Sequence, residues 1–190
     1  MGIYLVSVAA DDWRDEEVLG PVAGAVDAEL GRRGLAPFVC PEPVRARRRP
    51  GTRFEEKLHR PIGSFDRLCR ARSDDTHEAL LGWEVLLPVD LADSVVLPAR
   101  SEDDDPTTVG GARRALAAAR RLADRLALPA GIPEHCDGLD LGRWFDGPAA
   151  VAAATAPGPW SEDLDAAYYT AVYLRAAEHA LRRGCPVAYS

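Results

Sequence analysis

The chain has 190 residues, of which 47% are hydrophobic, and this suits one globular domain with a single core. Its 23 basic residues comprise one lysine, Lys57, and 22 arginines, and it contains neither Asn nor Gln. These facts exclude a P-loop, an N-glycosylation site and a Cys-His-Asn relay, and the formal net charge of −7 makes non-specific nucleic-acid binding unlikely.

The first forty residues predict a strand, a helix and a second strand. The apolar run of residues 3–9 predicts a central strand buried on both faces. Residues 21–34 predict a helix, because Pro21 suits a first helical position and Gly34 suits a helix end. Residues 35–40 predict a short edge strand, since a proline interrupts them.

The next segment is less periodic. Residues 41–53 are rich in Pro and Arg and predict an exposed, mobile loop. Residues 54–72 fit two short helices separated at Pro61, and residues 75–82 predict a helix opened by a capping box.

The second half predicts a hairpin and two long helices. Residues 83–89 alternate between apolar and polar, and residues 94–97 return after a turn, which is typical of a hairpin. Apolar residues at helical spacing predict a helix from Pro106 or Thr107 to Leu126.

A connection rich in Pro, Gly and Ala, residues 147–160, precedes a last helix from about Ser161 to Gly184. No repeat or linker divides the chain. The elements predict one domain over residues 1–190, of α+β or α/β class. Its mixed sheet would have about four strands, including the N-terminal central strand and the hairpin, packed by three to five helices.

Asp11 and Asp12 follow the first predicted strand, where ligands of α/β sheets gather. Two carboxylates there are a candidate catalytic site and a candidate Mg²⁺ site. The simpler interpretation is a solvated acidic turn before a helix, and we favour it. No other cofactor is expected.

A second acidic run, residues 102–105, lacks the alternating spacing of a calcium loop, and we expect it to favour the start of the following helix. The pair Gly110 and Gly111 lacks the spacing of a phosphate-binding loop, so we expect it to allow close packing within that helix.

His135 and Cys136 place an imidazole and a thiol side by side, which makes them candidates for a nucleophilic site. Adjacent side chains rarely face each other, so Cys136 would need a remote histidine as its base. A half-buried thiol and an exposed imidazole are the simpler interpretation.

Glu178 lies on the apolar stripe of the last predicted helix, where burial would suit a general acid or base. The alternative is a position at the margin of the stripe, with Glu178 paired to Arg175 or Arg182. We favour the margin.

Arginines gather in two places. One group lies in the predicted mobile loop and is a candidate binding site for an acidic partner: Arg45, Arg47, Arg48, Arg49 and Arg53. The other group is expected to form the solvated face of one helix: Arg113, Arg114, Arg120, Arg121 and Arg125.

These features predict a small protein that binds a protein partner or a charged ligand, in a regulatory or immunity-type role. The alternative is a small-molecule hydrolytic enzyme that uses Asp11 and Asp12 with a divalent metal, or Cys136 as nucleophile. Four spaced cysteines without a CxxC pair, the Arg-rich composition and the absence of an apolar run of membrane length lead us to expect a bacterial, cytoplasmic protein that does not enter a membrane.

Overall fold

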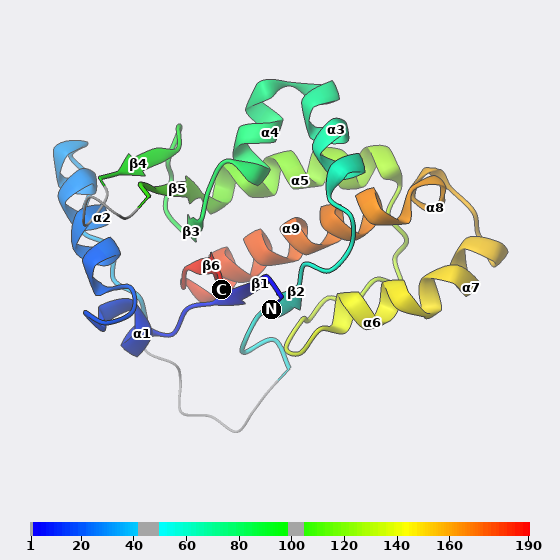
Figure 1. The fold of residues 1–190 in the computed structure, drawn as a ribbon, viewed down its shortest axis with the longest axis horizontal. Helices are drawn as coiled ribbons and strands as arrows, with labels where there is room; N and C mark the ends of the chain where they lie inside the picture. The colour runs from blue at the N-terminus through cyan, green and yellow to red at the C-terminus, as the bar shows by residue number, and fades with distance from the viewer. Residues whose placement is uncertain (1, 42–49, 99–104) are drawn as a thin grey trace.

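The computed structural model describes residues 2–41, 50–98 and 105–190, and six strands of this part join into one mixed sheet (Figure 1). The strands are β1 (Tyr4–Ser7), β2 (Glu55–Lys57), β3 (Val85–Leu87), β4 (Val95–Leu97), β5 (Thr107–Gly111) and β6 (Val187–Tyr189). Their order is β2–β1–β6–β3–β5–β4, and only the β3–β5 pair is parallel. The predicted number of about four strands is therefore too low.

Nine helices accompany the sheet in the described residues. They are α1 (Ala10–Arg14), α2 (Gly20–Arg32), α3 (Gly63–Arg72), α4 (Asp74–Leu81), α5 (Ala112–Leu126), α6 (Asp140–Asp146), α7 (Pro148–Thr155), α8 (Pro159–Glu162) and α9 (Leu164–Arg183). The fold is mixed α+β in one domain, as predicted, although three to five helices were expected. Short helices account for the excess, because one or two turns leave little periodic signal.

The sheet separates two apolar clusters. On one face, Leu5, Leu86 and Val187 pack with residues of α3, α4, α5, α6 and α9. On the other face, Val85 and Leu87 pack with residues of α1 and α2. Neighbours along β3 thus enter opposite clusters, because successive strand residues point to opposite faces. Figure 1 shows α1 and α2 at the β4 end of the sheet and α6 and α7 at the other end.

The N-terminal strand is an inner strand but not the central one. β1 pairs with β2 on one side and with β6 on the other, whereas β6 and β3 occupy the middle of the sheet. Within β1 only Leu5 is buried, while all three residues of β3 are. The expectation of burial on both faces therefore suits β3 rather than β1.

Residues 35–40 do not form the predicted edge strand. The Phe38 amide donates to the Asp27 carboxylate at 2.8 Å, and the Phe38 ring contacts Trp13 edge to face. Cys40 is buried in the cluster below α2. The segment is thus held by side-chain contacts with α1 and α2 instead of by pairing in the sheet.

The predicted hairpin of residues 83–89 and 94–97 is wrong in its pairing, although both strands exist. β5 lies between β3 and β4, parallel to β3 and antiparallel to β4. The predicted helix starting at Pro106 or Thr107 actually begins at Ala112, because residues 107–111 are β5.

Gly110 and Gly111 explain that strand. A Cβ at Gly110 would lie 3.0 Å from the Trp83 ring, and one at Gly111 would lie 3.0 Å from the Leu91 carbonyl oxygen. The glycines therefore allow close packing, as expected, but they do so in a strand and not in a helix.

The segment 54–72 is a strand followed by one helix, β2 and α3, and not two helices. The last predicted helix ends at Gly184, which adopts a left-handed conformation with φ 67°. It begins at Leu164 with Asp163 as its N-cap, three residues beyond the predicted Ser161. The connection of residues 147–160 contains α7 and the start of α8.

Helix α4 is capped two residues earlier than the predicted capping box, at Ser73 instead of Asp75. The Ser73 hydroxyl accepts a hydrogen bond from the Thr76 amide at 3.0 Å, while Asp75 pairs with Arg114. We expect Ser73→Ala to lower the free energy of unfolding by about 1 kcal/mol in urea denaturation, and Ser73→Gly by only about 0.3 kcal/mol. Equal losses in the two variants would contradict the capping role.

Candidate functional site

A cleft of about 530 Å³ opens beside the contact between α5 and α9, which run antiparallel (Figure 1). Alanines predominate in this contact and let the two helices pack closely, with Ala115, Ala119, Ala171 and Ala176 among those buried. Residues at helical spacing then line the cleft. They are Leu116 and Arg120 of α5, Arg175, Glu178, Leu181 and Arg182 of α9, and Glu134 of the connecting segment.

Arg175, which lines the cleft, is held in place by two hydrogen bonds. Its Nε donates to the Pro133 carbonyl oxygen at 2.9 Å, and its Nη1 donates to the Glu178 carboxylate at 2.8 Å. These two bonds fix the guanidinium and also tie residues 133–134 to α9. Arg175 is therefore a preorganised positive group.

The other two arginines of the cleft are not held by hydrogen bonds in this way. Arg120 Nη2 lies 3.7 Å from Glu178 Oε1, beyond hydrogen-bonding distance, and its side chain is 61% exposed. Arg182 has no hydrogen bond or ion pair with any residue of the described ranges. Two guanidinium forks therefore remain available to a ligand beside the fixed one.

The cleft combines an apolar base with an excess of positive charge. Leu116 and Leu181 are half-buried and belong to the margin of the main apolar cluster. The three arginines face two carboxylates, Glu134 and Glu178, so the lining carries a formal charge of +1. Planar forks beside an apolar base suit a carboxylate or a phosphate group.

Glu178 is the only residue of the predicted catalytic set that lines this cleft. It pairs with Arg175, one of the two partners expected for a position at the margin of the stripe. Its side chain is 24% exposed. The geometry thus favours charge pairing for Glu178, and a role as acid or base stays a prediction.

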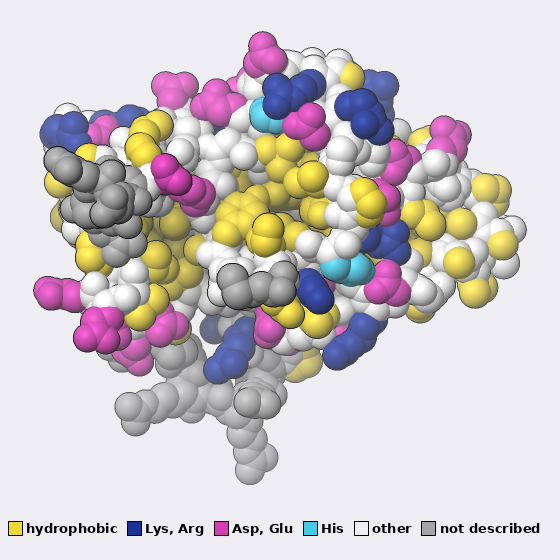
Figure 2. Space-filling view, viewed as in Figure 1, with side chains coloured by type: hydrophobic (Ala, Val, Ile, Leu, Met, Phe, Trp, Pro, Cys, Tyr) yellow, Lys and Arg dark blue, Asp and Glu magenta, His cyan; other side chains and the backbone are white. Residues whose placement is uncertain are grey.

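Asp11 and Asp12 lie elsewhere, in the first turn of α1, and both are exposed. Acidic side chains gather over α1 in Figure 2, so this end of the molecule is a solvated acidic surface. Among the described residues, no three His, Cys, Asp or Glu side chains come together as a metal-binding group. The Mg²⁺ site stays a prediction, which a thermal-shift titration of Asp12→Ala with MgCl₂ would test.

His135 and Cys136 point to different environments. His135 is exposed, whereas Cys136 is only 2% exposed and its thiol lies beside Glu56. Burial and the neighbouring Glu56 raise the pKa of the Cys136 thiol. Since the thiolate is the nucleophile, this environment opposes the predicted nucleophilic role.

The predicted arginine loop falls mainly outside the described residues, which include Arg53 but not Arg45, Arg47, Arg48 or Arg49. Arg53 is exposed, and its backbone amide donates to Asp137 at 2.9 Å. The helix arginines behave differently from expectation. Arg120 lines the cleft and Arg114 pairs with Asp75 and Glu78, so these two are not simply a solvated face.

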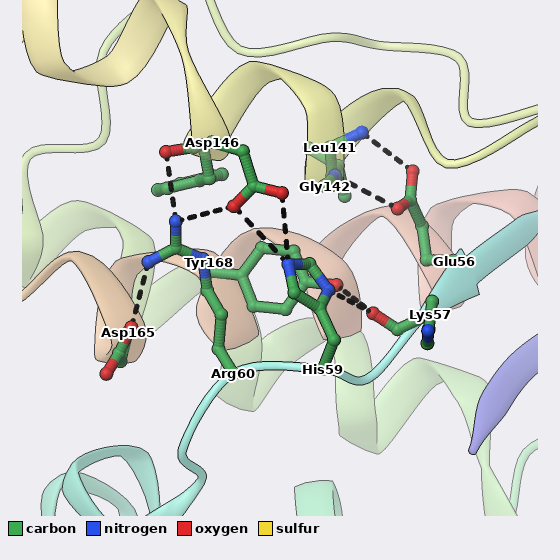
Figure 3. A network of polar contacts seen from close by, with 10 residues as sticks. Glu56, Lys57, His59, Arg60, Leu141, Gly142, Asp146, Asp165 and Tyr168 are labelled. Carbon is green, nitrogen blue, oxygen red and sulfur yellow. Dashed lines mark hydrogen bonds and ion pairs between the residues drawn. The ribbon is translucent and has the colours of Figure 1, made fainter. Parts of the chain in front are cut away.

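A polar network around Glu56 and Asp146 escaped the sequence analysis (Figure 3). Glu56 is 0% exposed, and its carboxylate accepts hydrogen bonds from the amides of Leu141 at 2.7 Å and Gly142 at 3.2 Å. Burial raises the pKa of Glu56 to about 7, although both hydrogen bonds favour the charged form. The two bonds attach the first turn of α6 to β2.

The second half of the network centres on Asp146. Its carboxylate lies 3.2 Å from His59 Nε2 and accepts from Arg60 Nη2 at 2.9 Å. Arg60 also donates to Asp165 at 2.9 Å, and His59 Nδ1 lies 2.9 Å from the Lys57 carbonyl oxygen, to which it donates. Burial raises the pKa of Asp146, but the bonds from His59 and Arg60 outweigh it and lower the pKa overall.

These groups border a pocket of about 230 Å³, lined by Glu56, His59, Gly142 and Asp146 among others. The sequence analysis missed Glu56 because it treated residues 54–72 as helical. The three residues of β2 are all charged, so their sequence does not indicate that the middle one, Glu56, is buried while Glu55 is exposed.

Comparisons of the chain with protein-family models, with curated proteins and with solved structures find no match. Within the described residues, no helix has the length and apolar character required to cross a membrane. The site must therefore be interpreted from its own chemistry.

Proposed function

We propose that the protein binds a small anionic ligand in the cleft between α5 and α9. One observation carries this proposal: Arg120 and Arg182 line the same cleft as the fixed Arg175, and neither forms a hydrogen bond with a described residue. An arginine that served only to solvate the surface would not need to line a cleft or to lie beside a fixed arginine. Three forks around one cavity supply the bidentate donors that carboxylates and phosphates accept.

The pocket near Asp146 fits this function less well because its polar groups already bind one another. Glu56 takes two backbone amides, both nitrogens of His59 face acceptors, and Asp146 holds His59 and Arg60. A ligand there would have to replace bonds that hold α6 in place. In the arginine cleft, a ligand would instead satisfy donors that water now solvates.

Binding of a charged ligand is one of the two modes expected from the composition, and it accords with a regulatory or immunity-type role in a bacterial cytoplasm. Contact between the acidic residues 11–17 and a basic protein partner would be a separate mode of binding. The cleft does not bear on it, since α1 packs on the opposite face of the sheet from α5 and α9.

Titration with inorganic phosphate and with citrate tests the proposal. We expect both anions to bind, to raise the melting temperature and to bind more weakly as NaCl increases. Arg182→Ala and Arg120→Ala should each weaken phosphate binding about tenfold or more, because each removes a charge-assisted hydrogen bond. Glu134→Gln should strengthen it by about two- to fivefold, because it removes a repelling charge. Isothermal titration calorimetry gives these affinities.

Arg121→Ala is the matched control. Arg121 is the next residue along α5, is equally exposed, and does not line the cleft. Its replacement should leave phosphate affinity unchanged. Equal losses in Arg121→Ala and Arg182→Ala, or no binding of either anion at low salt, would refute the proposal.

A further inference from the structure

A second, apolar pocket adjoins the arginine cleft. Its volume is about 220 Å³, and it lies between the end of α5, the segment that follows it, and the middle of α9. Apolar side chains form most of its wall, among them Leu128, Pro129, Ile132 and Leu174. Arg175 lines both this pocket and the cleft, so its side chain lies between the two spaces.

The wall of this pocket is built into the fold. Helix α5 ends at Ala127, which adopts a left-handed conformation with φ 49°, and the Leu128 amide then donates to the Ala123 carbonyl at 3.1 Å. The bond from Arg175 to the Pro133 carbonyl oxygen fixes the far end of the same segment. The pocket thus lies beside a segment that is fixed at both ends, and Arg175 is part of its wall.

Resting on the proposed function, we infer that the ligand is an amphipathic anion, with a carboxylate or phosphate head and a short hydrocarbon tail. The head would accept hydrogen bonds from Arg120 and Arg182 in the cleft. The tail would pass Arg175 and displace water from the apolar pocket between Leu128 and Leu174. Charge complementarity sets the orientation, because Arg120 and Arg182 line the cleft, whereas the pocket wall contains the carboxylate of Asp124.

A purely polar anion would leave this pocket unused. A ligand with a tail gains from every methylene that it transfers out of water, and each buried methylene tightens binding about fourfold. The chain length of the ligand therefore separates this inference from simple anion binding.

The experiment compares acetate, butanoate, hexanoate and octanoate by isothermal titration calorimetry against the full chain. We expect affinity to rise about fourfold per methylene and then to level off when the pocket is full. Octylammonium, which has the same tail and the opposite charge, should not bind. Arg182→Ala should weaken octanoate and phosphate alike.

Two variants probe the tail alone. Leu128→Ser makes the wall polar, and Ala130→Leu adds volume at an exposed position of the rim. Both should flatten the dependence on chain length and leave phosphate affinity unchanged, and the unliganded melting temperature shows whether each variant folds.

The outcomes distinguish the two proposals. If phosphate binds and acetate binds as tightly as octanoate, the amphipathic ligand is wrong and the anion cleft stands. If octanoate affinity is unchanged in both tail variants, the tail does not lie where we infer. If octanoate affinity is unchanged in Arg182→Ala, the head does not lie where we infer. If no anion binds, both proposals fail.

Discussion

Glu56→Gln is expected to lose stability relative to the wild type as the pH falls from 8 to 5, by about 2.5 kcal/mol. The pKa of Glu56 is about 7 in the fold, compared with 4.5 for an ordinary glutamate. A raised carboxyl pKa means that the folded protein binds a proton more tightly than the unfolded chain. The stabilisation is therefore complete below about pH 4.5 and is lost as the pH rises through 7.

Glutamine abolishes this titration and changes little else in shape. Its amide oxygen can accept from the Leu141 amide, but its NH₂ group faces the Gly142 amide, so a constant destabilisation accompanies the substitution at every pH. The informative quantity is the change with pH of the difference between the two proteins. Urea denaturation at pH 5, 6, 7 and 8 measures it.

Glu55→Gln is the matched control, because Glu55 is the neighbouring residue of β2 and is exposed. The difference between wild type and this control should stay constant over the same range. If Glu56→Gln also gives a constant difference, the buried carboxyl is ionised throughout, and its environment does not raise the pKa.

Local patterns predicted individual elements well, and pairing between distant ones poorly. The apolar run of β1 and the glycine at the end of α9 each act through neighbours in sequence, and both elements exist, although β1 is neither the central strand nor buried on both faces. The hairpin failed because its two strands do exist but β5 lies between them. The sequence of residues 83–97 does not indicate that another strand is inserted between them. The inserted strand, β5, contains Gly110 and Gly111, which made it difficult to predict as a strand.

Part of the candidate site could likewise be predicted from local sequence patterns. The margin position of Glu178 and its pairing with Arg175 follow from helical spacing, because both residues lie on α9. Arg120 could not be assigned to the same site, since only the antiparallel packing of α5 against α9 brings it there. Glu56 was not predicted as a site residue for a related reason. Its hydrogen-bond partners are the backbone amides of Leu141 and Gly142, which lie 85 and 86 positions away in the sequence.

The second large effect concerns His179 of α9, which is 2% exposed and whose Nε2 has no hydrogen-bond partner in the described part of the chain. The pKa of His179 is lowered to about 4, mainly by burial and also by the charges of Arg182, Arg183 and His135, against the opposing effect of Asp137. The unfolded chain therefore binds a proton here between about pH 4 and 6.5, while the folded protein does not.

His179→Leu should consequently gain about 2.5 kcal/mol relative to the wild type as the pH falls from 7.5 to 4.5. A leucine cannot titrate, and it also removes the unpartnered nitrogen from an apolar environment that includes Phe54. Urea denaturation at pH 4.5, 6 and 7.5 measures the gain. His135→Gln, a change at an exposed histidine, should give a nearly constant difference over the same range.

The two effects have opposite signs over nearly the same pH range. As the pH falls, protonation of Glu56 stabilises the fold, while protonation of His179 in the unfolded chain destabilises it. The contributions of these two residues to the stability of the wild-type protein should therefore nearly cancel from pH 5 to 7. Each variant removes one of these contributions and leaves the other in its pH profile. Glu56→Gln should therefore lose stability in acid, and His179→Leu should gain it. Parallel pH profiles for wild type and His179→Leu would show that this histidine is charged inside the fold.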